Sequence, residues 1–255
     1  MSEFLSALRS GFGFLTTIPV GITIEGIERL MKHIYLFPVI GAVLGIILAA
    51  VAYGFSMLFP PLIVSVVIII AIYYLTGFNH VDGLADFGDG VAAHGTKEKK
   101  IAAMRDTAVG TGGILFCIVA LIGLFSSLFS IAENRPSLPY ILPLALIVAE
   151  TCAKQAMVTV AAFGRRLHQG FGAMTVDNTR KSDFMIGMIF SGLVCYLFLG
   201  VPGIEALIIS QLAGLLVLNT ANRHFGGVSG DVVGASNEIG RLAALLFIGG
   251  FVWMP

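Results

Sequence analysis

The stretch that decides the fold is IYLFPVIGAVLGIILAAVAYGFSMLF, residues 34–59, which contains no charged side chain. A helix needs about 20 mostly apolar residues to cross a bilayer, so this run is long enough to do so. Further apolar runs follow it, at 62–77, 112–132, 138–163, 184–200, 203–221 and 241–254. The sequence therefore predicts an all-α integral membrane bundle of about seven transmembrane helices, of which the second and the seventh are short.

The composition is that of a membrane protein. Of the 255 residues, 57% are hydrophobic and 12% are charged, whereas a soluble domain carries about 25% charged residues. The 15 basic and 15 acidic side chains cancel, so the net charge does not favour a nucleic-acid partner. We expect one integral membrane domain, residues 1–255, in contact with lipid. A homo-oligomer stays open, because Gly41 and Gly45 suit close helix packing within or between chains.

A shorter helix is predicted before the first span. Phe4, Leu5, Leu8, Phe12 and Leu15 recur at helical spacing. This pattern is typical of an interfacial helix that lies on the membrane surface. An ordinary first helix packed on the bundle fits the same spacing.

The distribution of basic residues orients the predicted bundle. Three connections are long and polar, at 78–111, 164–183 and 222–240, and alternating spans place them on the same side as the N-terminus. The other side holds only Arg135. The basic residues on the side of the long connections are Arg9, Arg29, Lys32, Lys97, Lys99, Lys100, Arg105, Arg165, Arg166, Arg180, Lys181, Arg223 and Arg241. Because basic loops stay in the cytoplasm, we expect a multi-pass protein of the cytoplasmic membrane with cytoplasmic N-terminus and long loops.

The first of these connections contains HVDGLADFGDG, residues 80–90. Spacings of four and three residues put Asp82, Asp86 and Asp89 on one face of a helix. Three ionised carboxylates that close repel one another unless a proton or a cation lies among them. Magnesium takes oxygen ligands and binds carboxylates together with substrate phosphate. The stretch predicts a catalytic magnesium–phosphate site, and a solvated acidic loop is the alternative.

A second candidate segment is MRDTAVGTGG, residues 104–113. Asp106 would add a carboxylate to the metal site, and Arg105 has the planar fork that holds phosphate. The glycines open the third apolar run, where helix N-terminal N–H groups favour anions. A plain helix start with surface charges is the alternative.

A third candidate segment is NRHFGGVSGDVVGASNE, residues 222–238. Arg223, Ser229 and Gly230 are predicted to bind substrate and Asp231 to complete the metal shell, because glycine-rich backbone with arginine and carboxylate suits a diphosphate. Asp231 as a simple helix cap is the alternative. Together the three segments predict phosphoryl transfer, in which a carboxylate takes a proton from an attacking hydroxyl.

Charged residues also lie inside the fourth apolar run. Glu150 and Lys154 are four residues apart and share a helix face. A charge within a span costs about 2.5–3.5 kcal/mol on insertion scales, so both should face the protein interior. Either they form a neutral pair that holds helices together, or Lys154 binds an anionic substrate.

The motifs resemble those of a known family. GFNHVDGLADFGDG, MRDTAVGTGG and GGVSGDVVGASNE together are similar to cobalamin synthase, the adenosylcobinamide-GDP ribazoletransferase family. FLTTIPV near the start and YLFPVIGAVLG at 35–45 fit this family in the same order. Thr17 stands where the family usually has an arginine. The resemblance spans nearly the whole chain.

This resemblance implies a magnesium-dependent reaction late in vitamin B12 biosynthesis. Adenosylcobinamide-GDP would be joined to α-ribazole or its 5′-phosphate, with release of GMP, to give adenosylcobalamin or its 5′-phosphate. Asp86 or Asp89 is then the better candidate for the general base. His80 matches a family-like position and would hydrogen-bond an aspartate or a phosphate, unless it only satisfies backbone at a helix end.

Two other function classes fit the sequence less well. A CDP-alcohol phosphotransferase would need Asp-Gly-x-x-Ala-Arg, but Asp86 follows Ala85 where the arginine should be. A transporter could use Glu150 and Lys154 as a coupling site. A transporter site should, however, lie near the midplane of two related halves, whereas most polar residues here lie on one side.

Overall fold

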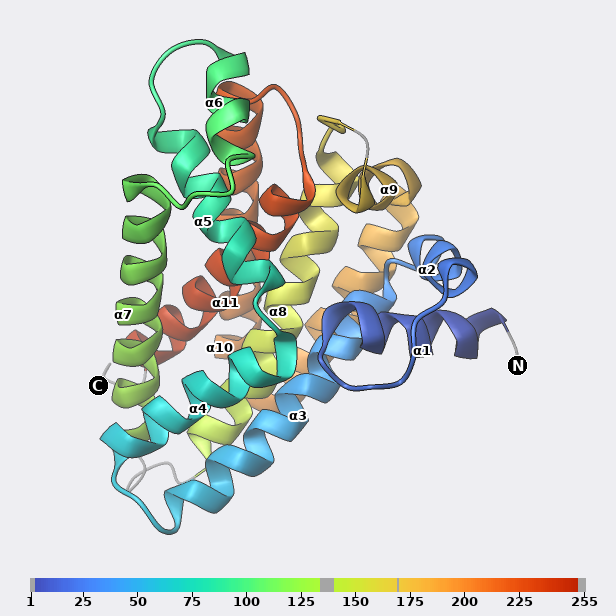
Figure 1. Ribbon diagram of the computed structural model, residues 1–255. Coiled ribbons are helices and arrows are strands. Elements are labelled where there is room, and N and C mark those ends of the chain that lie inside the picture. Colours follow the sequence, from blue (N-terminus) through green and yellow to red (C-terminus); the bar gives the residue numbers. More distant parts are fainter. Residues whose placement is uncertain (1–2, 134–139, 169, 252–255) are drawn as a thin grey trace.

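The computed structural model describes residues 3–133, 140–168 and 170–251. Within these ranges the chain is helical and contains no β-strand, only an isolated bridge between Arg166 and Val228, so the predicted all-α fold is confirmed (Figure 1). The helices in chain order are α1 (Glu3–Leu15), α2 (Ile24–Met31), α3 (Leu36–Ser56), α4 (Pro61–Thr76), α5 (Asn79–Ala92), α6 (Lys97–Met104), α7 (Thr111–Glu133), α8 (Ile141–Phe163), α9 (Phe171–Asn178), α10 (Lys181–His224) and α11 (Gly230–Phe251).

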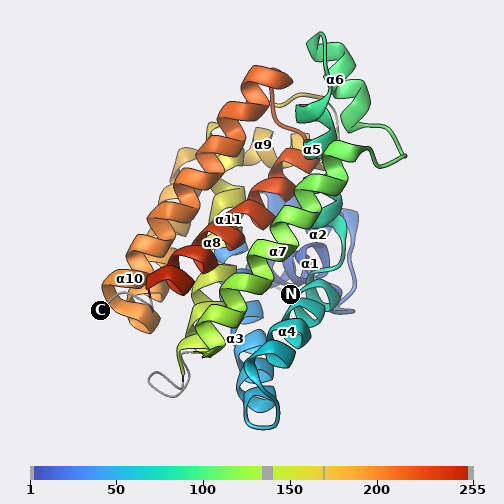
Figure 2. The ribbon, with the colours of Figure 1, turned by 90° about the vertical axis from the view of Figure 1, so that its left-hand side faces the viewer.

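Five of the described helices are long and apolar enough to cross a membrane: α3, α7, α8, α10 and α11. A sixth span results if α4 and α5, which are bent by 95°, are counted as one. The sequence predicted about seven spans. This number is higher because two of the predicted apolar runs, 184–200 and 203–221, both lie in α10, which is counted once. Its 44 residues are broken at Gly200, where φ is +62°, and Figure 2 shows its two halves folded back on each other.

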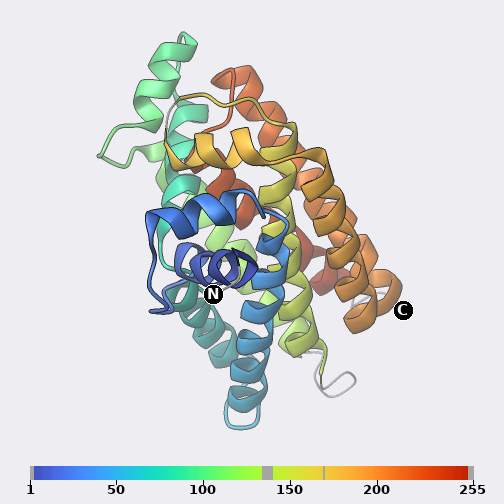
Figure 3. The same cartoon turned by 90° about the vertical axis from the view of Figure 1, so that its right-hand side faces the viewer.

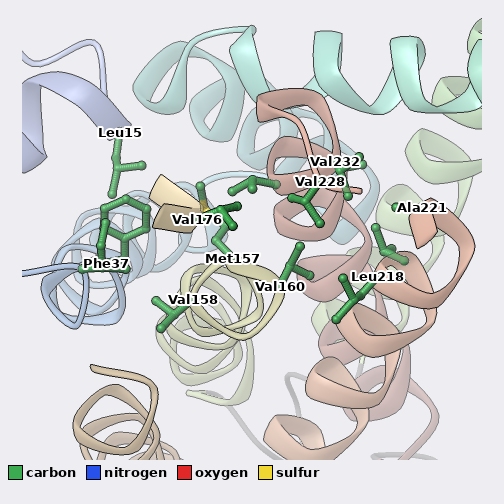
Figure 4. Packing of buried hydrophobic residues seen from close by; sticks show 14 of the residues in the cluster. Leu15, Phe37, Met157, Val158, Val160, Val176, Leu218, Ala221, Val228 and Val232 are labelled. Carbon is green, nitrogen blue, oxygen red and sulfur yellow. The ribbon is translucent and has the colours of Figure 1, made fainter. Parts of the chain in front are cut away.

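Helix α8 is the centre of the bundle. All its residues from 145 to 161 are buried, and it packs against α3, α10 and α11. Figure 4 shows part of this packing, with Phe37 of α3, Met157 and Val160 of α8 and Leu218 of α10 in one buried cluster. Helices α7 and α10 bury only 22% of their most apolar windows, so their outer faces are the ones suited to contact lipid.

Two glycines of α3 allow its close approach to α8. A Cβ atom added to Gly45 would lie 2.5 Å from the Cα of Ile147, and one added to Gly41 would overlap the carbonyl oxygen of Glu150. Small residues let helix backbones approach in this way. Both glycines therefore pack within the chain.

We expect Gly45→Leu to lower the free energy of unfolding by about 1–3 kcal/mol, the usual effect of overpacking a close contact. The measurement is denaturant or thermal unfolding of the purified protein in detergent. Gly54→Leu is the matched control on the same helix, because a Cβ atom there would meet nothing within 4 Å. Equal losses in the two variants would contradict the proposed contact.

The N-terminal helix predicted from its apolar spacing is α1. It lies across α3 rather than along it (Figure 3) and packs on α2 and α3. Its buried residues are Ala7, Ser10, Gly11 and Leu15, whereas Phe4 and Leu5 are exposed. Packing on the bundle is thus confirmed, and a position on a membrane surface stays a prediction.

The segments predicted to form a site gather at one end of the bundle. The connections from α5 through α6 to α7, from α8 to α9 and from α10 to α11 all lie at the upper end in Figure 1, opposite the turn between α3 and α4. One expectation is wrong. The third connection does not continue to residue 240, because α11 begins at Gly230 and includes Asp231, Glu238 and Arg241.

Candidate active site

A sharp bend separates the aspartate-rich stretch from the helix that precedes it. Helix α4 ends at Gly77, which has φ +68°, a left-handed conformation that glycine adopts readily. Helix α5 then starts at Asn79 and runs at 95° to α4. The stretch is helical, as its aspartate spacing requires, but it does not continue the second apolar run.

Three predicted aspartates share one face of α5, and a fourth approaches from α11. Burial and the negative charges of Asp231, Asp82 and Asp89 raise the pKa of Asp86 to about 6. Helices α5 and α11 cross closely here, because a Cβ atom on Gly83 would lie 2.9 Å from the carbonyl oxygen of Asp231. The structure thus brings together four of the five carboxylates predicted to bind metal.

Asp89 differs from the other aspartates because both of its oxygens are engaged. They accept backbone N–H bonds from Gly110 at 2.7 Å and from Gly113 at 2.8 Å, at the start of α7. A carboxylate is favourable at a helix N-terminus. These bonds make Asp89 a link between α5 and α7. Asp82, which lines two pockets, is better placed to contact a ligand.

Ser229 and Asp231 form the start of α11. The hydroxyl of Ser229 donates to Asp231 Oδ2 at 3.1 Å and accepts from the backbone N–H of Val232 at 3.4 Å. Ser229 is buried, so this hydroxyl closes the helix start rather than facing a ligand. The predicted substrate contact at Gly230 is better placed, because Gly230 lines the main pocket.

The carboxylate cluster has the chemistry of a magnesium site that is completed by substrate. Among the described residues, no three His, Cys, Asp or Glu side chains are grouped so that they could hold a metal ion. Magnesium usually keeps several waters and binds one or two carboxylates together with substrate phosphate. The donors at this end of α5 are carboxylate oxygens, and burial together with the negative charges of neighbouring aspartates raises the pKa of Asp86. These residues fit an ion that takes only one or two protein carboxylates.

A pocket of about 430 Å³ opens beside Asp82 and Asp231. Its rim includes the first turns of three helices, at Asn79 of α5, Gly172 of α9 and Gly230 of α11. The starts of α9 and α11 abut, because a Cβ atom on Gly172 would overlap the backbone of Gly230. Helix N-termini present unpaired N–H groups to anions. The rim therefore combines carboxylates for a cation with N–H groups for a phosphate.

His80 lines the same pocket and is only 8% exposed. Burial, with the positive charges of Lys154 and Arg241, holds the pKa of His80 well below its usual range, so the imidazole is neutral. Its Nδ1 atom has no hydrogen-bond partner among the described residues. A buried polar atom left unpaired costs about 1–3 kcal/mol. Nδ1 therefore makes neither the predicted bond to an aspartate nor a bond to the helix backbone.

Asp82 also borders a second pocket. This pocket has a volume of about 350 Å³ and lies between α5 and α7. Its other lining residues are Phe78, Val81, Ala85, Val109, Gly113, Ile114, Cys117 and Ile118. Asp82 thus stands between a pocket with a polar rim and an apolar one, which is an arrangement suited to joining two substrates.

Three predicted site residues lie away from these pockets. Asp106 accepts a bond from the backbone N–H of Ala108 at 3.0 Å and borders a separate pocket beside Asp89. Arg105 is exposed at the end of α6, and Arg223 is exposed in the last turn of α10. The structure does not bring any of the three to the lining of the pockets at Asp82.

Lys154 is fully buried, and the first of its two predicted roles is the one observed. Its Nζ atom lies 3.4 Å from Glu150 and donates to Asn237 Oδ1 at 2.7 Å. Arg241 joins the same network through Glu150 at 2.5 Å and Glu238 at 2.7 Å. Lys154 does not line the main pocket, and its contact with substrate stays a prediction.

The network on α11 was not predicted because Glu238 was expected in a connection, 222–240, and Arg241 at the edge of the last apolar run. Glu238 and Arg241 are three residues apart, a spacing at which opposite charges on a helix can pair. That spacing was the available signal. No sequence spacing identifies the apolar residues that line the main pocket, because they come from segments far apart in the sequence.

Comparisons with known proteins show the family of the chain. The chain matches the family model for cobalamin-5-phosphate synthase over residues 7–249. It is 43% identical to the adenosylcobinamide-GDP ribazoletransferase of Methanosarcina barkeri, over 99% of both chains. It is 44% identical to that of Methanosarcina mazei, over 97% of this chain and 93% of the relative, and 42% identical to that of Methanococcoides burtonii, over the full length of both.

No solved structure matches the chain. The family model and these relatives nevertheless cover almost all of it, including the carboxylate cluster and both pockets. The chain therefore belongs to the cobalamin-5-phosphate synthase family.

Proposed function

We propose that this protein joins adenosylcobinamide-GDP to α-ribazole or α-ribazole 5′-phosphate and releases GMP. Relatives that are 42–44% identical over nearly their whole length are named for this transfer. The observation that carries the proposal is the position of Asp82, which lies between two pockets and beside a cluster of carboxylates. A transferase that brings together two substrates needs such a position.

Each step of the proposed reaction is assigned to residues of the site. The ribazole hydroxyl attacks the phosphorus on the cobinamide side of the diphosphate, so a new P–O bond forms while the P–O bond to GMP breaks. Asp86 is the proposed general base that takes the hydroxyl proton, because the other candidate, Asp89, is engaged by the start of α7. Backbone N–H groups at the starts of α5, α9 and α11 would hold phosphate oxygens.

We further propose that magnesium is the cofactor, with Asp82 and Asp231 as its protein ligands and with waters and substrate phosphate completing its coordination. When bound with substrate, the ion would neutralise the charge of the diphosphate. Asp82 and Asp231 line the pocket rim from α5 and α11, so they would also fix the substrate between these two helices.

The end of the bundle that carries the site is proposed to face the cytoplasm. The connections at that end hold most of the basic residues, including Lys97, Lys99 and Lys100 of α6, and basic loops stay in the cytoplasm. A single cysteine placed on α6 of a cysteine-free variant should react with an impermeant reagent in inverted vesicles and not in intact cells. The opposite labelling pattern would reverse this orientation.

The function is tested with purified protein in lipid, adenosylcobinamide-GDP and α-ribazole 5′-phosphate. We expect GMP and a corrinoid product in equal amounts, and both should disappear when magnesium is chelated and return when it is restored. Folded protein that forms neither product from intact substrates would contradict the assignment. Turnover of a CDP-alcohol substrate under the same conditions would replace it.

A further inference from the structure

The chemistry of the main pocket separates the two nucleosides of the proposed reaction. Given that proposed function, on which this inference rests, we infer that the 430 Å³ pocket binds the benzimidazole base of the ribazole and not guanine, with His80 as the residue that recognises it. The observations that carry this assignment are the size of the pocket, its apolar wall and the single unpaired atom of His80.

The size of the pocket suits a nucleoside. Sites for small molecules usually enclose about 300–1,000 Å³, and this pocket lies at the small end of that range. A corrinoid ring with its amide side chains is far larger than a nucleoside and would have to stay outside. The pocket can therefore hold one of two groups, either the ribazole or the guanosine end of the other substrate.

The wall of the pocket favours a flat apolar ring. Phe14 of α1, Phe37 of α3, Met157 of α8 and Val233 of α11 all line it. Its charged side chains, Asp82 and Asp231, are at the starts of α5 and α11, beside the exposed rim residue Asn79. A base seated against the wall would therefore leave its ribose directed toward the carboxylates, where the hydroxyl must react.

The hydrogen-bonding capacity of the buried part of the pocket is small. His80 is more than nine-tenths buried, and its Nδ1 atom has no partner among the described residues. Native proteins rarely leave such an atom unpaired. Because Nδ1 has almost no exposed surface, the His80 ring would turn when a ligand in the pocket that it lines becomes the partner. The hydroxyl of Thr175, which also lines the pocket, is already directed to Met31 Sδ at 3.5 Å.

The number of polar atoms on each base decides between the two nucleosides. A benzimidazole attached to ribose has one free ring nitrogen, an acceptor that can pair with an Nδ1–H donor of His80. Guanine has acceptors at N7 and O6 and a donor at its amino group, and an apolar wall would leave most of them unpaired. Sites reject ligands whose polar groups stay buried without partners.

The inference is tested by equilibrium binding of α-ribazole and, separately, of GMP to the purified protein in lipid nanodiscs, without the corrinoid. We expect His80→Leu to weaken α-ribazole binding about tenfold, the effect of one lost hydrogen bond in a buried site. His80→Asn keeps an N–H donor near the position of Nδ1 and should lose no more than about threefold. The affinity for GMP should not change in either variant.

If His80→Leu does not fold, a second variant tests the same inference. Val233→Trp fills the pocket from the apolar wall, so it should abolish α-ribazole binding and leave GMP binding intact. In steady-state kinetics the His80→Asn and Val233→Trp variants should raise KM for the ribazole and leave KM for the corrinoid substrate unchanged.

The outcomes separate this inference from the proposed function. Variants that weaken GMP binding and spare α-ribazole would assign the pocket to guanine and overturn the inference, as would wild-type protein that makes product with binding unchanged in all variants. Selective loss of α-ribazole binding would support it, even for a preparation that releases no GMP, in which case the proposed function fails alone.

Discussion

Asp82→Asn should lower transferase activity by about 10²–10⁴-fold, the range for loss of a directly acting catalytic group. Asp82 is the one aspartate of α5 that borders both pockets, so it can contact the diphosphate wherever the two substrates meet. Asparagine has the same shape but no charge, and therefore removes the metal and phosphate chemistry without leaving a gap. The measurement is the rate of GMP release in lipid at saturating substrates.

The fold of this variant should be unaffected. Asp82 is exposed, and exposed substitutions usually change the free energy of unfolding by no more than about 0.5 kcal/mol. Glu205→Gln is the matched control, an exposed acid-to-amide change on α10 that lines neither pocket at Asp82. It should retain full activity. A folded Asp82→Asn enzyme with wild-type rates would remove Asp82 from the mechanism.

The requirement for magnesium gives a second measurement on the same variant. If Asp82 is one of the metal ligands, the residual activity should need at least about tenfold more magnesium for half-maximal rate, because one charged ligand is lost. The Glu205→Gln control should keep the wild-type magnesium dependence. An unchanged magnesium requirement in Asp82→Asn would assign Asp82 to substrate contact instead.

The membrane architecture could be predicted because it depends on local sequence. Uncharged runs such as 34–59 leave few alternatives to a spanning helix. The direction of α5 could not be predicted, because it depends on the left-handed conformation of Gly77. The start of α11 was misread for a different reason. Glu238 and Arg241 look like loop residues until their partner Glu150 on α8 is known.

The candidate site, like the fold, could be predicted only in part. The spacing of Asp82, Asp86 and Asp89 predicted a shared helix face, and α5 provides it. Phe14, Phe37 and the other wall residues of the main pocket come from separate helices, so only tertiary packing identifies them. For Arg105 and Arg223, residue type and loop position predicted phosphate contacts, but neither residue lines the pockets at Asp82, so these contacts stay predictions.

The second large effect concerns the buried ion network, and Glu150→Leu should destabilise the protein by about 3–5 kcal/mol. Two carboxylates, Glu150 and Glu238, balance two bases, Lys154 and Arg241, and all four are at most 4% exposed. Removing one carboxylate leaves a buried positive charge without compensation, and breaking a buried pair in this way has such costs. Unfolding in detergent measures the effect.

Two further variants separate charge balance from packing. Glu150→Leu combined with Arg241→Met removes one charge of each sign, and apolar replacement of a buried pair is often nearly neutral, so the double variant should recover most of the lost stability. Glu25→Gln disrupts the exposed pair of Glu25 with Arg29 and should cost no more than about 1 kcal/mol. If the double variant is as unstable as Glu150→Leu alone, the network matters through its hydrogen bonds rather than its charge balance. Because Asp231 lies on the same helix as Arg241, a stable double variant that loses activity would show that the network also positions α11 for catalysis.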